Sequence, residues 1–283
     1  MKLRSYSVMA RPVCILLLLL LSLSTRAQTP ENLELAKAEN HLQNLFTELY
    51  SDSLSAPDSI LTIIQEMMPG ALASEGAMEF PWSNLDKIGV ITSDDGQIRV
   101  FTWHVADDPD NYRYFGYIQM ALKKNRVRVF ALVDNMKPQR DLRRLDQSLE
   151  DWYGKLYYNI VTRKYKRKIL YTLLGMDFNN SRSNIKTVEG MVIQRNQPEF
   201  AKELFFNGRD NVDRVVVEYS SQVAMTVNYN PELDMIAFDH LVPFHPIYEG
   251  NYEFYGPDGS FDGLEFVTGR WILVEDLDVR NQN

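Results

Sequence analysis

The sequence predicts a mainly β protein, built as an antiparallel, hairpin-connected sheet with an α-helical segment at its N-terminus. Three observations support this fold class. From about residue 81 onward, short runs rich in Val, Ile, Tyr, Phe and Trp alternate with Gly, Asn, Asp and Pro. Most connections between these runs have hairpin length, which is too short for a parallel crossover. Two stretches with helical spacing of apolar residues precede them.

The first 27 residues have the layout of a secretory signal peptide. Three basic residues precede an aliphatic run at 13–21, and small and polar residues lead up to Ala27. The run is short for a bilayer span, so we expect cleavage after Ala27 and export, with a retained N-terminal anchor as the alternative. Cys14 lies at the start of the run and not after it, and therefore cannot become the lipidated first residue of a mature lipoprotein.

The net charge and the cysteine content limit the binding partners and the chemistry that the chain can have. Four of the 30 basic residues and none of the 38 acidic ones lie in residues 1–27, so the mature chain carries a net charge of −12 and has no cysteine. Such a negative charge disfavours binding to nucleic acid, and the lack of cysteine excludes catalysis by a thiol group. We expect a protein without a transmembrane span after cleavage, located in the periplasm or on the periplasmic side of the outer membrane.

Residues 28–80 form the predicted helical segment. Apolar residues recur at three- and four-residue steps in two stretches on either side of Pro57. The residues concerned are Leu35, Ala38, Leu42, Leu45, Phe46, Leu49, Ile60, Leu61, Ile63, Ile64, Met67 and Met68. Pro69 and Gly70 are expected to end the second helix. Because two helices alone make a small core, we expect both to pack against the β-domain.

Residues 81–283 form the predicted β-domain, with one short helix at 141–151. The expected strands are 97–105, 112–121, 126–133, 155–162, 168–175, 185–193, 214–219, 222–229, 235–241, 264–267 and 270–275. An Asp-Gly turn leads into an aromatic strand at 93–103 and again at 256–263, as in many propeller blades. No strict repeat follows, so a propeller, a sandwich and a barrel all stay open.

No common catalytic motif is present. The chain lacks Gly-x-Ser-x-Gly, His-Glu-x-x-His, the P-loop and the dinucleotide glycine pattern. A glycosidase needs only two carboxylates brought together by the fold, so the question of enzymatic activity stays open. Asp239 and His240 are adjacent, but successive strand residues point to opposite faces, and we expect a structural role for both. A metal shared by His240 and His245 would lack a third ligand.

Charged and aromatic residues of the strands have two interpretations each. Residues 163–168 place five positive charges at a predicted hairpin tip, where they suit either an anionic ligand or the protection of a sheet edge, and we favour the second. Nine tyrosines suit either sugar stacking or cross-strand packing, and packing is favoured for most of them. They are Tyr112, Tyr114, Tyr117, Tyr157, Tyr158, Tyr219, Tyr229, Tyr252 and Tyr255.

Two loops concentrate side-chain oxygens and are the predicted ligand site. The first loop carries Asp177, Asn179 and Asn180, and the second carries Asp258 and Asp262. The second loop begins like a calcium loop, Asp-x-Ser-x-Asp-Gly, but its twelfth position is glycine instead of the required Glu. Tight turns also need these residue types. No cofactor is predicted beyond a calcium ion, which these oxygens suit if both loops lie at one end of the sheet.

Four segments carry a resemblance to a known family. They are residues 171–180, 238–243, 255–263 and 274–281. With them, the chain resembles a family of uncharacterised exported proteins of Bacteroidota-type bacteria over residues 97–281. In that pattern Trp and Gly stand where this chain has Met176 and Phe178. The resemblance implies export and implies no activity.

The expected function is therefore that of an exported periplasmic or envelope-associated β-domain that binds an unknown envelope partner or ligand through its loops. The alternative is a hydrolase, with glycans as a candidate substrate class, whose carboxylates the fold brings together.

Overall fold

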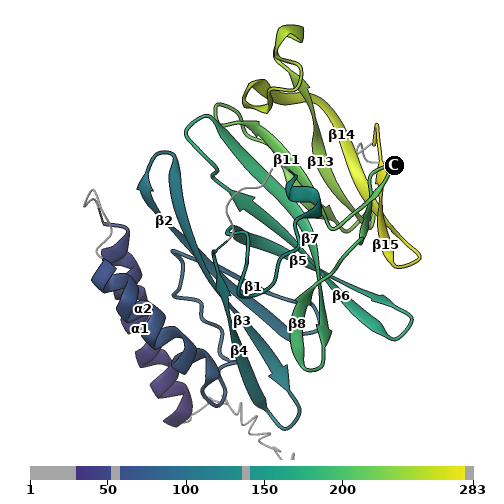
Figure 1. The fold of residues 1–283 in the computed structure, drawn as a ribbon. Coiled ribbons are helices and arrows are strands. Elements are labelled where there is room, and N and C mark those ends of the chain that lie inside the picture. The colour runs from purple at the N-terminus through teal and green to yellow at the C-terminus, as the bar shows by residue number, and fades with distance from the viewer. Residues whose placement is uncertain (1–29, 52–57, 136–140, 278–283) are drawn as a thin grey trace, which may run out of the picture.

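The computed structural model describes residues 30–51, 58–135 and 141–277, and these form a mainly β fold of four layers. Two helices make the first layer, and three open sheets make the others (Figure 1). The predicted fold class is confirmed. None of the described sheets closes into a barrel, and no described helix combines the length and apolarity needed to cross a membrane.

The helices α1 (Pro30–Leu49) and α2 (Asp58–Ala73) pack on the first sheet, as expected. This sheet has the strand order β1 (Gly89–Thr92), β2 (Ile98–Asp108), β3 (Asn111–Leu122), β4 (Arg126–Val133). Leu42, Ile64 and Trp103 are fully buried in the core between helices and sheet. The N-terminal segment and the β-domain therefore share one hydrophobic core.

Helix α2 does not end at Pro69, contrary to the prediction, but continues to Ala73. A proline inside a helix leaves the carbonyl four residues earlier without its N–H donor. Here that carbonyl belongs to Gln65, and the Tyr117 hydroxyl of β3 donates to it at 3.2 Å. The sheet thus replaces the hydrogen bond that Pro69 removes.

The second sheet lies in the middle of the molecule. Its order is β11 (Arg214–Ser220), β7 (Ser183–Gln194), β6 (Lys168–Asp177), β5 (Leu156–Tyr165), and β8 (Gln197–Phe200) also pairs with β7. One face packs on the first sheet through Leu173 and Met191, and the other packs on the third sheet through Leu174 and Val188. Burial on both faces explains the near-continuous apolar sequence of β6.

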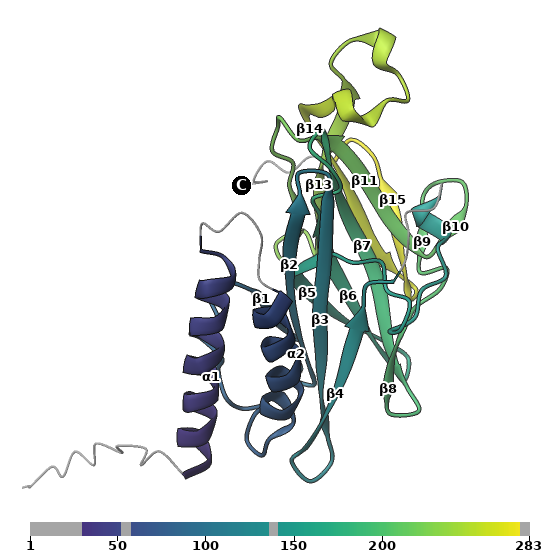
Figure 2. The same ribbon diagram turned by 60° about the vertical axis from the view of Figure 1, so that its left-hand side comes forward.

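The third sheet has the order β10 (Asn211–Val212), β9 (Phe205–Phe206), β15 (Arg270–Val274), β14 (Tyr255–Val267), β13 (Met235–Pro243), β12 (Val227–Asn230). All its pairs are antiparallel except β9 with β15. Residues 244–254 connect β13 to β14 and project beyond the sheets (Figures 1 and 2). This projection contains the 3₁₀ turns Pro246–Tyr248 (η2) and Tyr252–Phe254 (η3).

Three expectations about elements are wrong. The strand expected at 222–229 begins at Val227, and the strand expected at 264–267 begins at Tyr255. The short strands β1, β8, β9 and β10 were not expected. In place of a helix at 141–151 there is one 3₁₀ turn, Leu142–Arg144 (η1). Its carbonyls do not continue a helical ladder, because the Arg214 guanidinium donates to Leu142 O at 2.9 Å and to Leu145 O at 3.1 Å.

Candidate functional site

A groove of about 420 Å³ opens where the central sheet meets the projecting 244–254 segment. Strand β11 forms its floor, η1 lies along one side, and η3 with the start of β14 lies along the other. The lining residues are Asp141, Leu142, Arg143, Asn179, Ile185, Val216, Val217, Glu218, Leu241, Tyr252 and Tyr255. The groove therefore combines two aromatic rings, apolar strand residues and a few charged groups.

The aromatic wall consists of Tyr252 and Tyr255, whose ring centroids are 4.9 Å apart. The backbone N–H of Gly250 donates to the Tyr255 hydroxyl at 2.9 Å, which fixes that ring. Arg182 reaches the projection from the loop after β6 and pairs with Glu253 at 3.0 Å. Tyr252 is half-exposed, so its ring surface is available to a ligand.

The polar residues of the groove come from η1 and β11. Asp141 at the start of η1 is paired with a cation, whereas Glu218 of β11 is hydrogen-bonded only to neutral groups. Arg143 Nε lies 2.9 Å from Asp141 Oδ1, and this hydrogen bond lowers the pKa of Asp141. Glu218 accepts hydrogen bonds from the neutral donors Ser183 Oγ at 2.7 Å and Asn179 Nδ2 at 3.5 Å. Among the described residues no cation pairs with Glu218, so the groove carries a negative charge at this position.

The first predicted loop lies beside the groove, but it contributes only Asn179 to the lining. Asp177 is buried, where its carboxylate accepts hydrogen bonds from the hydroxyls of Tyr114, at 2.8 Å, and Tyr153. Burial and the nearby carboxylate raise the pKa of both tyrosines, which therefore stay protonated donors. Asn180 Oδ1 accepts the backbone N–H groups of residues 182 and 183, so it shapes the turn.

The second predicted loop is not a loop, because Asp258 and Asp262 lie within strand β14. The strand pairs with β13 across an irregularity: Asp239 pairs with Phe261 and Leu241 with Pro257, so residues 258–260 of β14 bulge opposite His240. His240 Nδ1 is 2.8 Å from Asp262 Oδ2, and this hydrogen bond raises the pKa of His240. Asp258 Oδ1 accepts from the backbone N–H and the hydroxyl of Ser260, at 2.9 and 2.7 Å.

The two predicted loops thus lie at different places. Neither Asp258 nor Asp262 lines the groove that contains Asn179, although Tyr255 of the same strand does. In the part of the chain that the structure describes, no group of three or more His, Cys, Asp or Glu side chains is arranged to hold a metal. Calcium binding stays a prediction. Asp239 and His240 have separate partners, since Asp239 binds Thr226, so they do not form a couple.

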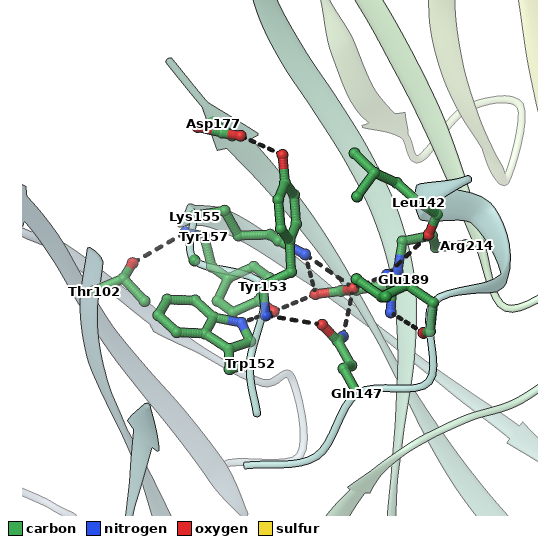
Figure 3. A network of polar contacts seen from close by, with 12 residues as sticks. Thr102, Leu142, Gln147, Trp152, Tyr153, Lys155, Tyr157, Asp177, Glu189 and Arg214 are labelled. Carbon is green, nitrogen blue, oxygen red and sulfur yellow. Dashed lines mark hydrogen bonds and ion pairs between the residues drawn. The ribbon is translucent and has the colours of Figure 1, made fainter. Parts of the chain in front are cut away.

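A buried polar network between the first and second sheets was not foreseen from the sequence (Figure 3). Glu189 of β7 lies at its centre, with Lys155 Nζ 3.0 Å from Oε1 and Arg214 Nε 3.0 Å from Oε2. Gln147 donates to Oε2 at 2.8 Å, and the Tyr157 hydroxyl also donates to the carboxylate. All three charged side chains are almost completely buried. The network joins β5, β7 and β11 to the segment around η1.

The network is suited to holding the sheets together. Burial lowers the pKa of Lys155 to about 8, although Glu189 opposes the shift. Burial alone would raise the pKa of Glu189, but Lys155 and Arg214 hold it below its ordinary value. None of these three residues lines the groove. The one sequence signal was a Glu between the apolar residues Val188 and Met191 in the middle of the expected strand 185–193.

One residue of the basic hairpin at 163–168 packs against the third sheet and is not free in solvent. Strands β5 and β6 do form a hairpin there, with Lys166 at the left-handed backbone angle φ 54°. Arg163, however, binds Asp234 and the Tyr229 hydroxyl, and its guanidinium lies 5.5 Å from the Trp271 ring centroid. It packs against the third sheet, so Arg163 is not part of a solvated anion site.

Comparison with protein-family models, curated proteins and solved structures finds no match to this chain. The candidate site consequently rests on geometry alone.

Proposed function

We propose that this is an exported periplasmic or envelope-associated protein that binds a ligand or partner in the groove between β11, η1 and η3. The observation that carries the proposal is the composition of the groove: a half-exposed tyrosine, a second tyrosine beside it and an unbalanced carboxylate around about 420 Å³ of open space. Binding sites typically combine such apolar surfaces with a few oriented polar groups. Export is supported by the signal-like N-terminus and by the family resemblance.

Binding fits this groove better than hydrolysis does. A glycosidase needs one carboxyl group whose pKa is raised, so that it can protonate the leaving group. Of the two acids that line the groove, Asp141 has its pKa lowered by Arg143. The neighbouring Asp177 is enclosed by two tyrosines and does not line the groove. Asp141 and Asp177 therefore lack the surroundings of a general acid beside open space, and the second lining acid, Glu218, is held by hydrogen bonds from Ser183 and Asn179.

The proposal is tested by mapping ligand contacts with NMR on the mature protein. The probes are capped extended peptides and neutral oligosaccharides such as cellohexaose and chitohexaose. We expect at least one probe to shift the backbone signals of Tyr252, Tyr255 and Asn179, and we expect Tyr252→Ala with Tyr255→Ala to abolish that binding. Ile169→Ala is the control, because Ile169 is an exposed apolar residue at the opposite end of β6. Shifts confined to another surface would refute the proposal.

A further inference from the structure

The floor of the groove is an edge strand, and two of its outward-facing residues, Val216 and Glu218, have no backbone hydrogen-bond partner among the described residues. Within the central sheet β11 pairs only with β7. Beyond their common ladder, the Ser221 N–H donates to Arg182 O at 2.9 Å, so odd-numbered residues of β11 direct their backbone groups toward β7. Even-numbered residues direct theirs outward. No described residue hydrogen-bonds to the outward groups of Val216 or Glu218, which both line the groove.

Three other described edges carry features that hinder pairing with a further strand. Edge strand β4 carries Arg126 and Arg128, β10 has only two residues, and the four-residue β12 is followed by Pro231. Lysine or arginine side chains, proline and short length are the usual protections of a sheet edge. Strand β11 has seven residues without Lys or Pro, and its single cation, Arg214, is buried against Glu189.

We propose that the groove takes an extended polypeptide segment of a partner protein, which adds as a strand to the open edge of β11. This inference rests on the proposed function and names its ligand class. The added strand would bond to the outward groups of Val216 and Glu218, while its side chains alternate between the two walls.

The walls also specify the side chains that the partner segment should carry. Glu218 lacks a cationic partner among the described residues, and the mature chain is strongly acidic, so a basic side chain of the partner fits beside Glu218. Tyr252 and Tyr255 offer apolar ring surface at the aromatic wall. The segment therefore alternates basic with apolar residues. A second copy of this chain fits poorly, because it would bring another Glu218 and more negative charge to the edge.

The test uses two capped octapeptides, one that alternates valine with lysine and one that alternates tyrosine with lysine. We expect at least one to bind the mature protein and to shift the amide signals of Val216 and Glu218. N-methylation of alternate peptide bonds keeps the side chains but removes the donors of the added strand, so it should weaken binding at least tenfold. Replacing lysine by glutamate in the peptide should also weaken binding.

Protein variants separate backbone pairing from charge. Val216→Pro removes only an outward N–H, so the melting temperature should stay close to that of the parent while peptide binding is lost. Glu218→Lys should weaken binding of the lysine peptides at least tenfold, whereas Glu75→Lys, the same charge change at an exposed helix-end position, should leave it unchanged.

Each other outcome has a defined meaning. Binding of an oligosaccharide at Tyr252 and Tyr255 without peptide binding would overturn the strand-addition inference and keep the proposed function. A dimer that Val216→Pro dissociates would overturn the inference in favour of a second copy. If neither peptide nor oligosaccharide perturbs the groove, both the inference and the proposed function are wrong.

Discussion

Glu189 holds two buried cations in the space between the first and second sheets. Glu189→Gln would leave Lys155 and Arg214 without their countercharge in a site that excludes water. Removing one partner of a buried ion pair typically lowers the free energy of unfolding by about 3–5 kcal/mol, because the other charge stays buried without a counterion. We expect a loss of that size, measured by urea unfolding at pH 7.

The matched control for this change is Glu232→Gln, which alters an exposed side chain in the turn after β12. Its effect on the unfolding free energy should stay within about 0.5 kcal/mol. Equal effects of the two substitutions would show that the Glu189 network contributes no more than a surface charge.

His240 and Asp262 predict a specific pH dependence. The hydrogen bond to Asp262 raises the pKa of His240 above its ordinary value. A group whose pKa is raised by folding stabilises the folded state while it is protonated. The stabilisation by His240 is therefore complete below about pH 6.5, the pKa of histidine in the unfolded chain, and is lost as the pH rises through the pKa of His240 in the folded protein. Asp262→Asn should therefore lower the melting temperature more at pH 5.5 than at pH 9.

An NMR titration of His240 provides the direct measurement, in which Asp262→Asn should return the pKa toward 6.5. Asp86→Asn is the control, since Asp86 is exposed and lies in the segment before β1, away from the third sheet. An unchanged His240 titration in Asp262→Asn would contradict the pairing.

The candidate site was only partly predictable at the level of single residues. Asn179 could be singled out, because oxygen-rich turns are visible in sequence, whereas Tyr252 and Tyr255 stood among nine strand-region tyrosines for which packing was favoured. Glu218 could not, since its importance depends on which cations the fold places near it. Asp177 carries a carboxylate of the kind that binds calcium or sugar hydroxyls, but this carboxylate is buried against two tyrosines. Sequence spacing carries no information about that burial.

At the scale of elements, the packing of α1 and α2 on the first sheet gives a direct prediction. Leu42 is completely buried in that core, whereas Leu33 of the same helix is 47% exposed. Leu42→Ala should lower the unfolding free energy by about 2–5 kcal/mol. Leu33→Ala should change it by less than about 0.5 kcal/mol. Both values come from denaturant unfolding of the mature protein.

A larger change tests the same interface. Deleting residues 28–80 should uncover the apolar face formed by Phe101, Trp103 and Val105 and cause aggregation. A soluble truncated protein with the melting temperature of the parent would show that the helices form a separate unit.

Long strands were predictable, and the errors have identifiable causes. Strand β4 matches its expected range, because alternation over eight residues is a strong local signal. The extension of β14 back to Tyr255 was missed because Gly256, Pro257 and Gly259 are typical of turns. There the pairing with β13 outweighs local preference. The expected helix at 141–151 is replaced by one turn that ends in extended backbone at Leu145, and Arg214, from a distant strand, donates to the carbonyls of Leu142 and Leu145.

At the scale of the whole molecule, the order of the layers in space could not be derived from local patterns. Hairpin connections define which strands pair, but they do not define which sheet faces which. The position of the second sheet between the first and third depends on contacts between residues far apart in sequence, such as Trp271 with Thr172. This is why a propeller, a sandwich and a barrel could not be distinguished.

Export is the prediction that concerns the complete chain. Residues 1–27 lie outside the described part of the structure, so the sequence alone supports cleavage after Ala27. Mass spectrometry of the protein isolated from its native cells should find a mature N-terminus at Gln28, with the protein in the envelope fraction. Detection of an intact Met1, or of an N-terminus more than a few residues from Gln28, would contradict this cleavage.

The central sheet has a consequence for hydrogen exchange. Because the first and third sheets cover its two faces, solvent reaches the backbone amides of β6 only when a whole layer detaches. The amides of Leu173 and Leu174 should then exchange with deuterium at the rate of global unfolding, while those of the short outer strand β10 exchange through local opening. Comparable protection in β6 and β10 would mean that the layers separate far more readily than their burial implies.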